Sequence, residues 1–310
     1  MEAELQILRE QTTIFLILLL IGYVFYKIRL VNDTVVNSIP PLVLRLILPS
    51  MLLARLPLSG TRDEVLSMGW VLLGIIIMFG IHMLLAFLIG KIMRLKQPTM
   101  NVHLCVCALP NSAFVGYPLL FEIFPNETLF MAPYMLVDAF MLFVIAPILL
   151  NPGKDGGFKL DPRVFLTPTN FCLVIGVIML MTGLKLPPVL QTTCSELGSM
   201  SKGLGLFFIG AQIGRLGILH LIKRWQLYVM CVVKLVIAPV IIFYVLRLIG
   251  PLDYRYMVMI SIMSMLPSML TICMQAQDYG TDPDYAFGGL LLTTVIGMIT
   301  MPVILSWLVQ

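Results

Sequence analysis

Three ionisable residues, Arg45, Asp138 and Lys234, lie near the middle of long apolar stretches, where charged groups are rare. Each costs roughly 2.5–3.5 kcal/mol at the centre of a membrane helix, so a partner or an aqueous pathway is expected. Arg45 offers a planar fork of donors to a carboxylate, whereas Lys234 is a point charge. We expect Asp138 to take up a proton during turnover. The alternative is a static ion pair between Asp138 and Lys234 that holds two helices together.

Two prolines, Pro110 and Pro267, also fall inside apolar stretches. Proline lacks an amide donor and clashes with the carbonyl four residues earlier, so each helix should break near its middle. The half-helix after each break would begin with free amides, and a positive helix start suits an anion. The alternative is that both prolines only kink packed helices. The candidate anion-binding residues are therefore Pro110, Asn111, Ser112, Pro267, Ser268, Leu270 and Thr271, with Arg45 as a further donor.

Ten apolar segments carry these residues, and each is close to the length of about 20 residues that spans a bilayer. We therefore predict an all-α membrane protein with ten transmembrane helices, in which the fourth and ninth are broken and cross. The segments are 11–28, 34–56, 65–92, 100–124, 128–150, 164–184, 190–216, 224–248, 253–277 and 285–309.

The chain divides into two halves that resemble each other. Residues 1–150 form a first repeat of five helices, 151–163 a short cytoplasmic linker, and 164–310 a second repeat. In both halves a mid-segment proline is followed eleven or twelve residues later by an acid, Glu122 or Asp278. Because five helices per half is an odd number, equivalent helices must cross the membrane in opposite directions. This 5+5 inverted repeat is common among secondary transporters.

The distribution of basic residues predicts the orientation. With the amino terminus outside, the cytoplasmic loops carry eleven Lys and Arg residues and the opposite loops carry six. The positive-inside rule then places both termini outside. We expect an integral protein of the plasma (inner) membrane.

The composition excludes several classes of protein. Apolar residues make up 59% of the chain and charged residues 12%, against about 45–50% and about 25% in a soluble domain. The net charge of +4 gives no dense basic surface for nucleic acid. The six cysteines and three histidines show no metal-ligand spacing, so we expect neither a metal nor a cofactor. An intramembrane enzyme would need clustered acids or a metal site, and we expect none.

Several motifs together resemble the auxin efflux carrier family, which includes the plant PIN auxin exporters and bacterial carriers of malate and malonate. Residues 108–119, ALPNSAFVGYPL, resemble the signature of its fourth helix. Similar motifs of the seventh, eighth, ninth and last helices lie at 205–210, 234–239, 265–283 and 298–303. The resemblance therefore covers nearly the whole chain.

The resemblance implies a fold like that of sodium/proton antiporters and bile acid symporters. Helices one, two, six and seven would form a scaffold, and the others a mobile part of a homodimeric elevator carrier. It also implies that the substrate carboxylate meets Asn111 and the amides after Pro267. Two departures from the plant proteins are the short linker between the halves and the charge at Arg45.

We therefore expect a secondary active transporter of small organic anions, either mono- or dicarboxylates, malate/malonate-like or auxin-like. Arg45 could hold a second carboxylate, which favours malate- or malonate-like compounds. The expected partners are the organic anion, protons, membrane lipid and a second copy of the chain. The alternatives are a uniporter driven by the membrane potential, which supplies about 2.3 kcal/mol per charge at 100 mV, a sensor on the same scaffold, and an intramembrane enzyme.

Overall fold

The structure is a computed structural model that describes residues 2–58, 61–125, 127–150, 167–215 and 222–308. Within these ranges the chain is helical and contains no strand. All ten predicted segments are mainly helical where they are described, whereas the linker 151–163 lies outside the described residues. The first half contains α1 (Glu2–Lys27), α2 (Asp33–Leu42), α3 (Leu48–Arg55), α4 (Arg62–Ser67), α5 (Gly69–Ile92), α6 (Thr99–Ala108), α7 (Tyr117–Ile123), α8 (Met131–Phe140) and α9 (Ala146–Leu150). The second half contains α10 (Pro168–Thr182), α11 (Pro188–Arg215), α13 (Trp225–Val232), α14 (Ala238–Ile249), α15 (Tyr254–Ser264), α16 (Leu270–Asp278) and α17 (Pro283–Leu308).

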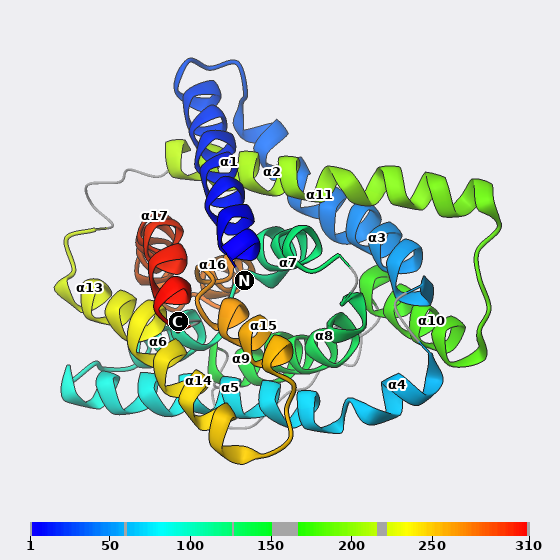
Figure 1. The fold of residues 1–310 in the computed structure, drawn as a ribbon. Coiled ribbons are helices and arrows are strands. Elements are labelled where there is room, and N and C mark those ends of the chain that lie inside the picture. Colours follow the sequence, from blue (N-terminus) through cyan, green and yellow to red (C-terminus); the bar gives the residue numbers. More distant parts are fainter. Residues whose placement is uncertain (1, 59–60, 126, 151–166, 216–221, 309–310) are drawn as a thin grey trace.

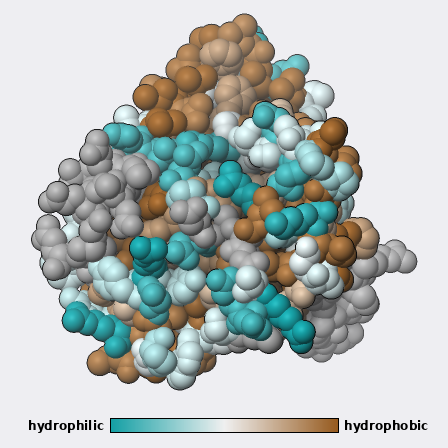
Figure 2. All heavy atoms as spheres, turned by 45° about the vertical axis from the view of Figure 1, so that its right-hand side comes forward, coloured by the Kyte–Doolittle hydropathy of each residue, from teal (hydrophilic) through white to brown (hydrophobic). Residues whose placement is uncertain are grey.

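Four helical stretches of the described chain are long and apolar enough to cross a membrane: Asp33–Leu58, Gly69–Ile92, Trp225–Ile249 and Pro283–Trp307. Shorter apolar helices include the two pieces of the broken fourth segment. Helix α1 exposes large apolar side chains between Ile14 and Phe25, and the part of the molecule that projects at the top of Figure 2 is mainly hydrophobic. Such a surface suits lipid rather than water.

A single turn of π-helix interrupts the helices at four places in the described chain. These turns are η1 (Val43–Ile47), η3 (Ser112–Gly116), η5 (Met141–Ile145) and η7 (Val233–Ile237). Each ends two residues before a proline, namely Pro49, Pro118, Pro147 and Pro239. Since proline has no amide to continue the α-helical ladder, the residue before it bonds one residue further back, as Leu48 does to the Val43 carbonyl. The prolines therefore widen the helices locally.

The helices pack in two groups (Figure 1). Helices α1, α2, α3, α10 and α11 pack mainly on one another, and α5 to α9 pack with α13 to α17. Figure 1 shows α11 and α5 on opposite sides of the molecule. The groups meet where α1 contacts α7 and α17, α11 contacts η3, and α10 contacts α8.

Glycines allow a close contact between α1 and α11 in the first group. A Cβ atom at Gly22 would collide with the Phe207 carbonyl of α11, and one at Gly210 with the Leu19 carbonyl of α1. The Gly210-x-x-x-Gly214 motif thus serves to bring two helix backbones together.

Candidate functional site

The two broken helices meet in the centre of the second group. Helix α6 ends at Ala108 and the chain is helical again from Ser112, while α15 and α16 are separated by residues 265–269. The Asn111 amide donates to the Pro267 carbonyl at 2.7 Å, and the Met269 amide donates to the Leu109 carbonyl at 3.0 Å. These two bonds form a short antiparallel bridge. Backbone groups released by the breaks therefore satisfy one another, as a low-dielectric interior requires.

This pairing corrects the prediction that all amides after the prolines are free for a ligand. The amides of Asn111, Ser112 and Ser268 already donate to protein acceptors, the last to the Thr293 hydroxyl at 2.9 Å. The next amides, at Ala113, Phe114, Leu270 and Thr271, have no acceptor within their own helix. No side chain of the described residues caps the start of η3 or of α16. Of the predicted amides, those of Leu270 and Thr271 thus remain available, whereas at the first break the available donors follow Ser112.

The side chain of Asn111 lies beside these helix starts and is 0% exposed. Neither its Nδ2 nor its Oδ1 has a hydrogen-bond partner among the described residues. Leaving a buried amide unpaired costs roughly 1–3 kcal/mol, so native proteins rarely do so without a reason. Asn111 is therefore available to bind a ligand on both its donor and its acceptor.

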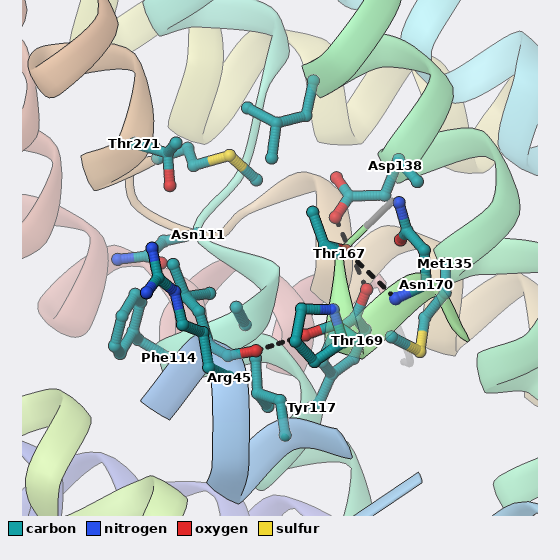
Figure 3. Close-up of a pocket in the computed structure, with 17 residues that line it drawn as sticks. Arg45, Asn111, Phe114, Tyr117, Met135, Asp138, Thr167, Thr169, Asn170 and Thr271 are labelled. Carbon is teal, nitrogen blue, oxygen red and sulfur yellow. Dashed lines mark hydrogen bonds between the residues drawn. The ribbon is translucent and has the colours of Figure 1, made fainter. Parts of the chain in front are cut away.

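A cavity of about 270 Å³ opens beside Asn111, between the two groups of helices. The first group contributes η1 and the start of α10, and the second contributes η3, α7, α8 and the start of α16. Figure 3 shows the side chains of this cavity. The polar residues that line it are Arg45, Asn111, Tyr117, Asp138, Thr167, Thr169, Asn170 and Thr271.

Asp138 reaches the cavity from α8 and is 7% exposed. Its Oδ2 accepts hydrogen bonds from the Ser112 hydroxyl at 2.5 Å and from the Tyr117 hydroxyl at 3.4 Å. Its Oδ1 is buried and has no partner in the part of the chain that the structure describes. Like Asn111, Asp138 keeps one polar atom available to a ligand.

Arg45 lies in η1 and has an exposed side chain at the cavity wall. Because Pro49 has no amide to offer, the Leu44 carbonyl lacks a helical partner and instead accepts the Thr169 hydroxyl at 2.5 Å. This bond ties η1 to the start of α10. The π turn thus positions Arg45 and joins two walls of the cavity.

Lys234 does not form the ion pair with Asp138 that was considered as an alternative. No salt bridge joins these two described residues. Lys234 is 0% exposed, and its Nζ donates to the Cys107 carbonyl at 2.7 Å. In a continuous helix the Asn111 amide would bond this carbonyl, but here it bonds Pro267. The Lys234 ammonium therefore neutralises the negative end of α6.

The predicted site residues fall into two sets. Arg45, Asn111, Asp138 and Thr271 line the cavity together. The other predicted residues lie elsewhere in the described structure, most of them in the buried crossing: Pro110, Ser112, Pro267, Ser268, Leu270 and Lys234. Ser112 nevertheless acts on the cavity through its bond to Asp138.

Sequence reasoning missed four of the polar lining residues, namely Tyr117, Thr167, Thr169 and Asn170. Thr167 caps the start of α10, where its hydroxyl accepts the Asn170 amide at 3.1 Å. The order Thr-Pro-Thr-Asn is a recognisable helix start. This motif predicts where α10 begins, but it does not predict that the start of α10 lines a cavity.

Comparison with known proteins identifies the family. The profile of a family described as "Membrane transport protein" matches residues 9–162 and 157–305. A protein of Methanothermobacter thermautotrophicus named "Uncharacterized transporter" is 23% identical over 296 residues, which cover 93% of this chain and 94% of that protein. Both matches extend over nearly the whole chain and confirm the family that the motifs resemble. The chain belongs to the membrane transport protein family, to which the auxin efflux carriers also belong.

Proposed function

We propose that this protein is a secondary transporter of small organic anions, which bind where the two broken helices cross. The observation that carries the proposal is the unpaired amide of Asn111, buried at the cavity wall beside two uncapped helix starts. The family membership supports transport over intramembrane catalysis. The carboxylate would accept hydrogen bonds from Asn111 Nδ2 and from the amides at these helix starts.

The size and charge of the cavity support a small anion. Its volume of about 270 Å³ lies just below the range of about 300–1,000 Å³ of sites for drug-sized ligands. Arg45 adds one positive charge and each helix start about half a charge. With Asp138 ionised, the site therefore carries about one net positive charge, which a single carboxylate neutralises. A second carboxylate would fit once Asp138 has bound a proton.

The position of the cavity supports an elevator mechanism. The cavity lies between the two groups of helices, and the first group comprises the segments that the resemblance assigns to a scaffold. Sliding the second group past the first would carry the anion with Asn111 and Asp138 across the membrane. In this proposal the two halves are inverted repeats, both termini lie outside, and two copies assemble through their scaffolds.

Asp138 suggests how transport is coupled. It has no cationic partner within 4.0 Å among the described residues, and a lone charge in the membrane centre costs roughly 2.5–3.5 kcal/mol. We therefore propose that the empty carrier takes up a proton on Asp138 and returns neutral. This cycle exchanges substrate for protons. Transport driven by the membrane potential alone is the competing mechanism.

Liposomes that contain the purified protein test this proposal. They would be loaded with labelled malate, malonate or indole-3-acetate, and efflux would be followed with an acidic exterior or with a potassium diffusion potential. We expect efflux of at least one acid above that of empty liposomes, accelerated by external acid in the wild type and not in Asp138→Asn. Acceleration by the potential alone would favour the uniporter. No efflux of any acid above empty liposomes would contradict the proposed function.

A further inference from the structure

The cavity is polar at two separate ends. Figure 3 shows Arg45, Asn111 and Thr271 on one side of the view, and Asp138 with Asn170 on the other. The first end offers mainly donors: the Arg45 guanidinium, the Asn111 amide and the start of α16. The opposite end carries a carboxylate. A ligand that fills the cavity therefore meets different chemistry at each end.

Asp138 Oδ1 is an acceptor that no protein group uses. The carboxylate is fixed through its other oxygen, because Ser112 and Tyr117 both donate to Oδ2. Figure 3 shows the carboxylate directed from α8 toward the side where Asn111 and Thr271 lie. Oδ1 is buried and has no hydrogen-bond partner among the described residues. Because Asp138 lines the cavity, a ligand held there could donate this hydrogen bond.

A simple carboxylic acid anion would satisfy only one end of this cavity. Its carboxylate would bind Asn111 and the helix starts, but its alkyl part would face Asp138 Oδ1 and leave that oxygen unpaired. Sites built around a hydrogen bond reject analogues that lack the matching group, because a buried polar atom then stays unsatisfied. The same carboxylate oxygen would also repel a second, ionised carboxylate.

We propose that the transported anion carries a hydrogen-bond donor, a hydroxyl or an ammonium group, which binds Asp138 Oδ1 while its carboxylate binds at Asn111. This inference rests on the proposed function and narrows its substrate class to hydroxy- or amino-substituted carboxylic acids. Asp138 thereby selects among organic anions that are equal in size and in carboxylate charge.

Two matched series of ligands test this inference by titration calorimetry on the purified full-length protein. Propionate, lactate and alanine differ only in a hydrogen, hydroxyl or ammonium at one carbon, and succinate, malate and aspartate form the corresponding four-carbon series. In at least one series we expect the hydroxyl or ammonium member to bind about ten- to a hundred-fold more tightly than the unsubstituted acid. The two substituted members distinguish a hydroxyl from an ammonium as the preferred donor.

Asp138→Asn gives a sharper test than a simple deletion, because it keeps the shape of the side chain. Its carbonyl oxygen would take the place of Oδ2 and accept from Ser112 and Tyr117, so its amide nitrogen would replace Oδ1. The hydrogen-bond acceptor at the position of Oδ1 is thus replaced by a hydrogen-bond donor. Asp138→Asn should therefore bind succinate more tightly than aspartate, whereas the exposed Asp278→Asn should keep the wild-type order.

The possible outcomes separate this inference from the proposed function. If wild type binds the unsubstituted acid as tightly as its substituted partners in both series, the role of Asp138 is refuted while a carboxylate carrier remains. An unchanged order of ligands in Asp138→Asn would refute it as well. If no acid of either series binds, the inference fails, and efflux of malonate or indole-3-acetate from liposomes then decides the proposed function separately.

Discussion

At the scale of single residues, the site is defined by polar atoms that remain without partners. Asn111 and Asp138 both line the cavity and both keep buried atoms unpaired in the described structure. Five further buried side-chain atoms also lack a partner among the described residues, and none of their residues lines the cavity: His82, Tyr134, Ser201, Gln275 and Thr300. Asn111 and Asp138 differ from these residues because they line a cavity, where a ligand could supply the missing hydrogen bonds.

Asp282, at the start of α17, differs from Asp138 because both of its carboxylate oxygens accept hydrogen bonds from protein groups. Its Oδ2 accepts the Thr99 hydroxyl at 2.5 Å and the Arg224 guanidinium at 2.6 Å, and its Oδ1 accepts the Tyr285 amide at 3.1 Å. Burial raises the pKa of Asp282, but these hydrogen bonds and the Arg224 charge outweigh it, so the pKa lies below its ordinary value of 3.8. Asp282 thus joins the starts of α6, α13 and α17.

This arrangement predicts how stability depends on pH. A carboxylate whose pKa is lower in the folded state stabilises the fold fully above its unfolded pKa, and the contribution is lost as pH falls through the folded pKa. Asp282 should therefore stabilise the protein fully at pH 5–7 and progressively less as pH falls below about 4. Thermal unfolding in detergent should show Asp282→Asn less stable than wild type at pH 6, with the difference shrinking below pH 4. An equal difference at both values would contradict the assignment.

At the scale of elements, the prolines determine the shape of the helices that form the site. The sequence correctly predicts interruptions at Pro110 and Pro267, because a missing amide and a ring clash follow from proline alone. It does not predict the π turns before Pro49 and Pro239, since Pro302 lies inside α17 without one. Whether a proline widens, kinks or breaks a helix depends on which neighbour satisfies the released carbonyl, as Thr169 does for Leu44.

Dependence on tertiary neighbours also limits how much of the site can be predicted from the sequence. Arg45 and Asp138 stand out because charge is rare in apolar segments, and Asn111 because it follows a break. Tyr117 and Thr169 are ordinary residues in their own segments, and only tertiary packing brings them to the cavity. The partner of Lys234 is a backbone carbonyl released by a break in another helix, which no pattern of side chains could show.

The π turn η1 leads to a prediction for Pro49→Ala. The new amide can bond the helix ladder, so the turn should revert to α-helix and rotate Arg45 away from its present direction. We expect about a ten-fold weaker binding of the transported acid with little loss of thermal stability, measured by calorimetry and by thermal unfolding. Pro302→Ala in α17 is the matched control and should bind normally. Normal binding by Pro49→Ala would show that η1 does not position Arg45.

At the scale of the whole molecule, the contacts within the first group of helices are of a different kind from the contacts between the two groups. Within the first group, α1 and α11 touch backbone to backbone at Gly210. Between the groups, polar contacts gather at the end of α7, where Lys202 of α11 lies 3.6 Å from Glu122 and Arg55 of α3 lies 4.4 Å from the ring of Phe121. The first group is thus joined by a backbone seam, and the contacts between the groups include an ion pair and a cation–π contact that can separate if the two parts slide.

The seam between α1 and α11 can be tested with two glycines on the same helix. A Cβ at Gly210 would collide with the Leu19 carbonyl, whereas at Gly203 nothing lies within 4 Å. Gly210→Ala should destabilise the protein by about 1–3 kcal/mol, because a backbone must shift. Gly203→Ala should be neutral or stabilising by up to about 1 kcal/mol, since alanine favours helix. Equal thermal stabilities of the two variants would exclude a close seam at Gly210.

The central claim is that the crossing of the broken helices holds the carboxylate through Asn111. The most direct measurement compares efflux of the transported acid from liposomes containing wild type, Asn111→Ala or Asn101→Ala, with thermal unfolding of each purified protein alongside. Asn101 lies on α6 and bonds the Leu149 carbonyl at 2.8 Å instead of lining the cavity. We predict that Asn111→Ala lowers efflux at least ten-fold without loss of thermal stability, because its amide has no protein partner to lose, while Asn101→Ala transports normally. Efflux by Asn111→Ala at the wild-type rate would contradict the account.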